Sequence, residues 1–472
     1  MKRTKIVATL GPASLKPSVL KKLLFEGVNV FRINFSHGSP EENRKTILSV
    51  KKLLTETKKH ASILADLQGP KLRIGTMKPN TRVLPGDNVV FTNVSCVGDK
   101  KKVFMTYSSF PNDVKIGETI LLNDGKLLMK VISSNLKDEV VAKVIQGGLL
   151  ESNKGVNLPN TRVSLPCLTL KDLADLNVAL EEEVDWVGLS FVRHKKDILE
   201  LRKILNKKNS GAGIIAKIEK PEAVSDIDAI LDEADAVMVA RGDLGVEVPL
   251  ESVPLIQKMI ISKAIQKAKP VIVATQMMES MIDNLTPSRA EVNDVSCAVI
   301  DGADAVMLSA ETSVGKYPVE VVKTMSKIVT ASESSSTTRI KGRKPESGDD
   351  RFLSNALCYQ AAKTANLVGA NSICALTYSG HSALLLSSFR PKSNIFIFTS
   401  NKSILNKLSL VWGVSGFYYN SMESTDKTFT EISKLLKSLN LINLGDKIIQ
   451  LASMPIAERG TTNTMRVIEV KN

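Results

Sequence analysis

Charged residues stand at the ends of several strand-like segments, and their types are those that handle phosphate and divalent metal. The segment 214–219 ends with Lys217 and Glu219, which the alternation of side chains along a strand puts on one face. The next such segment ends with Gly242 and Asp243, which adds a second carboxylate for a hard cation such as magnesium. We interpret this set as a shared ligand site, since side chains that point in parallel disfavour the alternative, a structural ion pair between Lys217 and Glu219.

Two other strand ends add cationic and hydroxyl groups. Arg32, Asn34 and Ser36 share one face of the segment 30–36, and three unpaired polar groups on a buried strand would cost several kcal/mol. Taken alone, this segment is better interpreted as a network of polar groups that satisfy one another. Thr275, at the end of the segment 271–276, offers one hydroxyl group.

Histidine is scarce, which bears on the kind of chemistry. The chain has only four His residues, of which His37 alone stands where it could touch a ligand. We therefore disfavour a nucleophilic or acid–base mechanism built on histidine. Stabilising a phosphoryl group in transfer requires only cations, a metal and positioning, and the glycine-rich P-loop motif is absent from the sequence.

The elements that must position these residues alternate between apolar strands and amphipathic helices. Eight such strands in series, each followed by a helix in most cases, predict a (β/α)8 TIM barrel whose strands are buried on both faces. In such a barrel the functional residues lie at the carboxyl ends of the strands. The predicted strands are 5–10, 30–36, 61–67, 186–191, 214–219, 236–242, 271–276 and 305–309.

The alternation of strands and helices is interrupted by one insert and is followed by one linker. Residues 69–168 contain short strands and turn residues without helices, which predicts an inserted all-β lid domain, a β-barrel, after the third barrel strand. The segment 332–350, rich in Ser, Thr, Lys and Gly, predicts a linker. We expect residues 1–68 and 169–335 to form the catalytic barrel and residues 350–472 to form a C-terminal α/β regulatory domain.

Composition narrows the class of protein. The chain has 472 residues, 43% of them hydrophobic, and no apolar run long enough to span a bilayer, so we expect no membrane partner. Its net charge of +14 comes from scattered lysine clusters, and aromatic residues make up only 4%, so we expect no nucleic-acid partner. Five widely spaced cysteines and the lack of a signal peptide predict a cytoplasmic protein.

Seven sequence motifs, in order along the chain, resemble those of the pyruvate kinase family. They are RINFSHG at 32–38, DLQGPKLRIG at 66–75, KGVNLP at 154–159, AKIEKP at 216–221, ARGDLG at 240–245, ATQMM at 274–278 and SAET at 309–312. The insert also falls where this family has its lid domain. The C-terminal part is similar in arrangement but lacks motifs of equal sharpness.

The resemblance implies transfer of a phosphoryl group from phosphoenolpyruvate to ADP, giving pyruvate and ATP, with Mg²⁺ or Mn²⁺ as cofactor. In that case Lys217, Arg32 and Thr275 are the catalytic residues, and Gly242 and Asp243 join them in binding substrate. The metal ligands implied are Glu219 and Asp243. The nucleotide-binding residues implied are Arg73, Lys154, Asn34 and His37.

One departure from the family pattern concerns potassium. Many members have Glu where this chain has Lys71, and the Glu form goes with a potassium requirement. By resemblance, the monovalent-cation ligands are Asn34, Ser36, Asp66 and the backbone of Leu67. Because the Lys71 ammonium could supply the missing positive charge permanently, we expect activity without potassium.

The resemblance also implies a homotetramer and a phosphorylated effector bound to the C-terminal domain. Ser379, Gly380, His381 and Ser382 precede a helix and form either a phosphate site or a plain helix cap. Two rival functions stay open. One is another barrel enzyme that handles phosphoenolpyruvate or pyruvate, such as an aldolase or mutase, and the other is a non-catalytic basic binding protein with the same fold.

Overall fold

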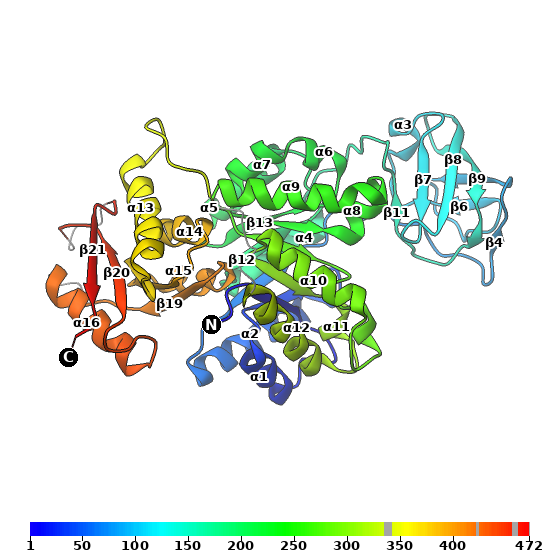
Figure 1. Ribbon diagram of the computed structural model, residues 1–472. Helices are drawn as coiled ribbons and strands as arrows, with labels where there is room; N and C mark the ends of the chain where they lie inside the picture. Colours follow the sequence, from blue (N-terminus) through cyan, green and yellow to red (C-terminus); the bar gives the residue numbers. More distant parts are fainter. Residues whose placement is uncertain (335–341, 422–423, 456–460, 472) are drawn as a thin grey trace.

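The computed structural model describes residues 1–334, 342–421, 424–455 and 461–471. Figure 1 shows three bodies in a row: a barrel surrounded by helices in the middle, a β-rich body on one side and a C-terminal body on the other. Among the described residues, none of the helices has the length and apolar content that crossing a bilayer requires.

The middle body is a closed barrel of eight parallel strands, which confirms the predicted TIM-barrel fold. Almost every strand residue is buried, because helices cover the outside and side chains fill the inside. The chain leaves the barrel after β3 and returns to it at β12. The strands are β1 (Lys5–Thr9), β2 (Val30–Asn34), β3 (Ser62–Asp66), β12 (Trp186–Leu189), β13 (Gly213–Ile218), β14 (Ala236–Ala240), β15 (Val271–Ala274) and β16 (Ala305–Leu308).

The barrel helices begin at side chains that satisfy the first free N–H groups. Ser39, Thr169 and Ser288 each form a capping box, in which the cap and the third helical residue bond each other's backbone. The helices are α1 (Pro17–Glu26), α2 (Pro40–Thr57), α4 (Leu170–Glu181), α5 (Lys195–Lys207), α6 (Pro221–Ser225), α7 (Ile227–Glu233), α8 (Arg241–Glu247), α9 (Val253–Gln266), α10 (Arg289–Asp301), α11 (Ala310–Ser313) and α12 (Pro318–Ser334).

The inserted body is built from a six-stranded and a two-stranded sheet around its own apolar core. It also has one helical turn, α3 (Phe110–Asp113), which the sequence pattern did not indicate. Within residues 69–168, the paired strands do not close into a single ring. The strands are β4 (Arg82–Val83), β5 (Asn88–Thr92), β6 (Lys102–Phe104), β7 (Thr119–Leu122), β8 (Leu127–Ser134), β9 (Glu139–Gln146), β10 (Gly148–Leu149) and β11 (Val156–Asn157).

The C-terminal body has a five-stranded sheet in the order β19-β18-β17-β20-β21, with β21 antiparallel at one edge. One face packs on α13 (Phe352–Val368) and α14 (His381–Ser388), and the other on α16 (Thr425–Ser438). The short α15 (Lys402–Lys407) precedes β19. The strands are β17 (Ser372–Leu376), β18 (Asn394–Thr399), β19 (Val414–Tyr418), β20 (Lys447–Ala452) and β21 (Thr464–Glu469).

The predicted linker 332–350 starts too early, because residues up to Ser334 continue helix α12. The expected end of the barrel at 335 and part of that linker lie outside the described residues. The C-terminal body joins the barrel through a buried ion pair, in which Arg390 lies 3.0 Å from Asp304. Trp412 adds a backbone hydrogen bond of 3.2 Å to Asp304. Asp304 immediately precedes β16, so this contact lies at the amino ends of the strands, opposite the end that bears the candidate site.

Candidate active site

A buried ammonium group lies at the carboxyl end of the barrel among residues from three strand ends. Lys217, on β13, places its Nζ 3.1 Å from Asp66 Oδ1 and 3.0 Å from Glu219 Oε1. The same Nζ donates a hydrogen bond of 2.7 Å to the hydroxyl of Ser190, which in turn donates to the carbonyl of Leu67. Three strand ends are thus held together by one lysine.

Lys217 and Glu219 form the ion pair that the alternation argument disfavoured, whereas the shared ligand site stays a prediction. Strand β13 ends at Ile218, so Glu219 lies beyond the region where strand alternation sets the side-chain direction. Its carboxylate turns back toward Lys217 and also accepts a hydrogen bond of 2.7 Å from the backbone of Phe191.

Arg32 supplies a second cation beside the first. Its guanidinium bonds Asp66 through Nε at 2.7 Å and through Nη2 at 2.7 Å, and donates from Nη1 to Thr9 at 2.9 Å. Burial opposes ionisation of Asp66, but Lys217 and Arg32 outweigh it and hold its pKa below the usual range. Asp66 is therefore the common anion that fixes both cations.

Burial and charge act differently on the other two members of this cluster. Burial disfavours the Lys217 ammonium, yet the carboxylates of Asp66 and Glu219 outweigh it and raise the pKa of Lys217. Burial raises the pKa of Glu219 to about 7; the Lys217 ammonium opposes this rise and the Asp243 carboxylate adds to it. Lys217 is therefore held in its charged form, whereas burial favours the neutral form of Glu219.

Gly242 and Thr275 meet where β14 and β15 end. The backbone N–H of Gly242 donates a hydrogen bond of 2.7 Å to the hydroxyl of Thr275. Thr275 has φ 71° and Gln276 has φ 54°, and this left-handed backbone is a genuine outlier for a β-branched residue. Arg241 holds this turn in place, with a hydrogen bond of 2.7 Å to the Thr275 carbonyl.

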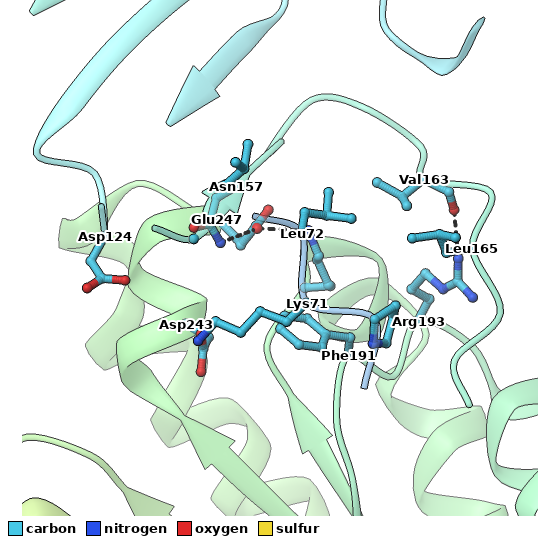
Figure 2. Close-up of a pocket in the computed structure, with 14 residues that line it drawn as sticks. Lys71, Leu72, Asp124, Asn157, Val163, Leu165, Phe191, Arg193, Asp243 and Glu247 are labelled. Carbon is cyan, nitrogen blue, oxygen red and sulfur yellow. Dashed lines mark hydrogen bonds and ion pairs between the residues drawn. The ribbon is translucent and has the colours of Figure 1, made fainter. Parts of the chain in front are cut away.

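A pocket lies between the barrel and the insert, and Asp243 forms part of its wall. Figure 2 shows Asp243 and Glu247, from helix α8, in this pocket together with Lys71 and Asn157 from the insert. Glu247 is buried and accepts hydrogen bonds from Lys220 at 2.7 Å and from Asn157 at 2.8 Å. The helix that bears Asp243 is therefore bonded directly to the inserted body.

The predicted nucleotide-binding residues fall into two groups. Arg73 and Lys154 lie on neighbouring segments of the insert, because Arg73 pairs with Gly155 and the Lys154 carbonyl accepts from Ile74 at 3.0 Å. Asn34 and His37 lie instead at the end of β2 on the barrel, and His37 is exposed. The two groups come from different bodies.

Of the predicted monovalent-cation ligands, Asn34 and Ser36 contact each other, and the carbonyl of Leu67 is bonded to another residue. The Asn34 side chain accepts a hydrogen bond of 3.1 Å from Ser36, and the Leu67 carbonyl accepts one of 2.6 Å from Ser190. Asp66 is engaged by two cations, as described above. Lys71 lines the pocket beside Asp243, and its side chain extends toward that carboxylate in Figure 2.

The predicted effector residues are far from this site, at the start of helix α14 in the C-terminal body. Gly380 has φ 84° and directly precedes the helix. The hydroxyl of Ser382 bonds Thr462 at 2.9 Å, and the ring of His381 bonds Asn355 at 3.1 Å. The backbone N–H of His381 bonds the Ser379 hydroxyl at 3.5 Å.

Sequence reasoning missed three residues that shape this site. Ser190 carries the hydroxyl that bonds Lys217, and it directly follows strand β12. Glu247 lies one helical turn after Asp243, and Arg241 forms two bonds of 2.7 Å to Asp294. Ser190 was detectable, since it is a polar residue at a strand end like the others.

The carboxylates present fit a magnesium ion that also takes ligands from substrate and water. No group of three or more His, Cys, Asp or Glu side chains that could hold a metal occurs among the described residues. Glu219 Oε1 is buried and is paired with the Lys217 ammonium at 3.0 Å, and a carboxylate oxygen has a second lone pair for a metal ion. Magnesium is commonly bound through one or two carboxylates together with phosphate oxygens and water.

The chain matches two family models along most of its length. Residues 1–322 match the model described as "Pyruvate kinase, barrel domain", and residues 355–468 match "Pyruvate kinase, alpha/beta domain".

Relatives of known name agree with these matches. The pyruvate kinase of Corynebacterium glutamicum is 41% identical over 468 residues, covering 99% of this chain and 97% of the relative. The pyruvate kinase of Mycobacterium tuberculosis is 40% identical over 467 residues, covering 99% and 98%. A crystal structure of a pyruvate kinase from Cryptosporidium parvum superposes with a TM-score of 0.92 at 32% identity, covering 99% of this chain and 96% of that one. This chain therefore belongs to the pyruvate kinase family of phosphotransferases.

Proposed function

We propose that this chain transfers the phosphoryl group of phosphoenolpyruvate to ADP through the cluster around Lys217. One observation carries this proposal: a buried ammonium and a buried guanidinium, fixed by the shared carboxylate of Asp66, stand beside the two carboxylates Glu219 and Asp243. Such a set can hold a highly charged phosphoryl group and a divalent ion in one place. The transfer needs little covalent chemistry from the protein beyond this positioning.

Lys217 and Arg32 bind the phosphate of phosphoenolpyruvate in this proposal. The bond between phosphorus and the enol oxygen breaks, and a new bond forms to the terminal phosphate oxygen of ADP. The Lys217 ammonium lies where it can neutralise charge on the phosphoryl oxygens as they move. Because the Lys217 side chain is only 11% exposed, its interaction with those oxygens is stronger than in water.

Glu219 and Asp243 would hold the magnesium or manganese ion. When bound, this ion supplies positive charge to the phosphate oxygens and orients them. Glu219 is held by the backbone N–H of Phe191, so this carboxylate is positioned before substrate arrives, and Asp243 lies on helix α8 in the wall of the pocket. A pre-positioned site avoids the cost of reorganisation during transfer.

Gly242 and Thr275 would contact the carboxylate of phosphoenolpyruvate, and the hydroxyl of Thr275 would lie on a water path to the enolate. That enolate takes up a proton at its terminal carbon to become pyruvate. The left-handed turn at Thr275 supports this role, since strained backbone of this kind is concentrated at functional sites.

Arg73 and Lys154, on the insert, would bind the phosphates of ADP together with Asn34 and His37 on the barrel. Since the two groups belong to different bodies, nucleotide binding would draw the insert toward the barrel. Closure would exclude water, which limits hydrolysis and strengthens each charge interaction. In this proposal the lid consists of residues 69–168 and the catalytic barrel of residues 1–68 and 169–335. The regulatory domain consists of residues 350–472.

Several wider properties belong to the same proposal. We expect a homotetramer that works in the cytoplasm, where the five cysteines, all free in the structure, stay reduced. We also expect a phosphorylated effector to bind the C-terminal domain, and activity that does not need potassium.

The test is an assay in which pyruvate is detected by lactate dehydrogenase. Pyruvate should form from phosphoenolpyruvate only when both ADP and Mg²⁺ or Mn²⁺ are present, in equal amount with ATP. An aldolase or mutase with this barrel would form no ATP from that mixture. A binding protein without activity would form no pyruvate at all, and either result would refute the proposal.

A further inference from the structure

The carboxylate of Glu247 joins three parts of the molecule that meet at the candidate active site. Its Oε1 accepts a hydrogen bond of 2.8 Å from Asn157, on strand β11 of the insert, and Figure 2 shows this contact as a dashed line. The same oxygen accepts a hydrogen bond of 2.7 Å from Lys220, on the segment that follows β13. Glu247 itself is the last residue of helix α8. One oxygen atom therefore connects the insert, the end of β13 and the helix that follows β14.

The two proposed metal ligands stand directly beside these contacts. Lys220 follows Glu219 in the chain, so the two residues share a peptide bond. Asp243 and Glu247 are four residues apart in α8 and thus lie on the same side of the helix, and both line the pocket between the barrel and the insert. The contact between Lys220 and Glu247 therefore links the backbone that carries Glu219 to the helix that carries Asp243.

The alternative is that this ion pair only stabilises the fold. The side chain of Lys220 is 12% exposed and that of Glu247 is 1% exposed. The cost of removing two charges from water can exceed their attraction, so a buried ion pair is weak evidence for stability. The second oxygen of Glu247, Oε2, is buried and forms no hydrogen bond with the residues that the structure describes, which adds to this cost. A positioning role accounts for the pair better, because a direct charge contact holds two segments at a set distance.

The insert contacts helix α8 at a second point. The turn between β7 and β8 contains Asp124, which lines the same pocket, and Gly125, which faces Val246 on α8. A Cβ atom added at Gly125 would lie 3.9 Å from the Val246 side chain. Asn157, at the first point, comes three residues after Lys154, a proposed nucleotide ligand. A movement of the insert on nucleotide binding would therefore act on α8 through both contacts.

We propose that Glu247 is a positioning residue, which sets the spacing of Glu219 and Asp243 for the divalent ion and links that spacing to the position of the insert. This inference rests on the proposed function, in which those two carboxylates hold Mg²⁺ or Mn²⁺. Glu247 acts on Glu219 through Lys220 and on Asp243 through helix α8. Because energetic coupling between two binding sites is reciprocal, a residue of the insert affects metal affinity, and Lys220 affects nucleotide affinity.

The experiment measures binding of Mn²⁺ to the full chain from the electron paramagnetic resonance signal of the free ion, without nucleotide and without turnover. Lys220→Met should raise the Kd for Mn²⁺ about tenfold, because loss of groups that orient metal ligands costs roughly 10- to 100-fold in affinity. Lys220→Arg keeps the charge and should stay within about threefold of the wild type. Asn157→Ala, a change on the insert, should raise the Kd about threefold.

Two further measurements test whether these effects share one carboxylate. The double variant N157A/K220M should raise the Kd for Mn²⁺ by less than the product of the single changes, because both residues act through Glu247. At saturating Mn²⁺, Lys220→Met should raise KM for ADP at least about threefold, which is the reciprocal effect.

The matched control is Arg202→Met, which removes an ion pair at the opposite end of the same two strands. Arg202 lies 2.7 Å from Asp235, which directly precedes β14 and also accepts a hydrogen bond of 2.8 Å from Ile214 on β13. This variant should leave both the Kd for Mn²⁺ and KM for ADP at the wild-type values.

The inference is wrong if Lys220→Met or Asn157→Ala binds Mn²⁺ as tightly as the wild type does. It is also wrong if Lys220→Arg is as impaired as Lys220→Met, or if Arg202→Met weakens Mn²⁺ binding equally, which would assign the effect to lost stability. Failure of the proposed function gives a different result, since the wild type would then form no pyruvate from phosphoenolpyruvate and ADP. A wild type that binds no Mn²⁺ at millimolar concentration would overturn both.

Discussion

Two largely buried lysines stand at opposite ends of the same barrel, and their pKa values move in opposite directions. Lys217, at the carboxyl end, lies within 3.1 Å of two carboxylates, and its pKa is raised. Lys5, on β1 at the amino end, donates a hydrogen bond of 2.8 Å to the Val414 carbonyl of the C-terminal domain. Burial lowers the pKa of Lys5 to about 8, although Glu333 and Asp304 oppose the change.

The barrel itself provides burial at both ends, so burial does not decide which end can carry out chemistry. The difference is the carboxylates in direct contact, which keep Lys217 charged at any pH where the enzyme works. A neutral carbonyl satisfies one hydrogen of Lys5 without balancing its charge. The carboxyl end thus holds its lysine through carboxylates in direct contact, whereas the amino end holds Lys5 through a backbone carbonyl of the C-terminal domain.

The largest expected effect tests the role of Lys217 at the carboxyl end of the barrel. Replacing Lys217 with Met should lower kcat by about 10³-fold, because one preorganised charge on the phosphoryl group is lost. Lys5→Met, which removes a buried ammonium from the other end, should keep kcat within a few-fold of the wild type. Steady-state rates of pyruvate formation give both values. If Lys217→Met kept more than a tenth of the activity, the proposed role of this residue would be wrong.

The second prediction concerns the stability contribution of Lys5. The pKa of Lys5 is about 8 in the folded chain, whereas the ordinary value, expected in the unfolded chain, is 10.5. As pH rises, the folded chain therefore releases this proton before the unfolded chain does. Stability therefore increases with pH between about 8 and 10.5, and Lys5→Met lacks this increase. The wild type should gain up to about 3 kcal/mol relative to the variant across this range.

Urea titrations at several pH values, followed by the fluorescence of Trp412 in a Trp186→Phe background, measure this difference. Trp412 reports the correct place, since Arg390 lies over its ring at 4.8 Å in the same domain interface. A stability difference between wild type and Lys5→Met that stays constant from pH 7 to 10.5 would contradict the lowered pKa.

The third prediction extends the comparison to the lid, which is bonded to the charged end of the barrel through Asn157 and Glu247. Asn157→Ala should raise KM for ADP about three- to tenfold, because one hydrogen bond to a charged group no longer positions the lid residues Arg73 and Lys154. KM for phosphoenolpyruvate should change less than twofold. The control is Gln146→Ala, an exposed lid residue that bonds only within the lid. Equal changes in both KM values would show that Asn157 does not act through the lid.

The sequence alone was sufficient to predict the barrel and to predict which end of it carries the charged residues. All eight strands occur where the apolar segments predicted them, and parallel closure brings Arg32, Asp66 and Lys217 to one end. Strand ends were less predictable. The segment 236–242 stops being a strand at Ala240 because Arg241 begins a helix, which no periodicity in seven residues indicates.

Contacts between bodies could not be predicted from the sequence. Glu247 bonds Asn157, which is 90 residues away along the chain and belongs to a separately folded insert. Alternation rules apply only inside a strand, which is why the contact of Glu219, one residue past β13, with Lys217 was not predicted. Side-chain direction beyond an element depends on tertiary packing rather than on local pattern.

The smallest expected effect concerns Lys71, in the pocket beside Asp243. A lysine carries its positive charge permanently, so turnover should differ by less than about twofold among sodium, potassium and large organic-cation buffers. Lys71→Glu should introduce a potassium requirement, because a carboxylate in that place leaves the transferring phosphoryl group without the charge that a bound cation would restore. Lys71→Gln, which removes the charge without adding a carboxylate, is the matched control and should lose activity in all three buffers alike. A steep dependence of the wild type on potassium would mean that the Lys71 ammonium does not act on the reacting phosphate. In that case Lys217 and Arg32 alone would supply the protein's positive charge to that phosphate.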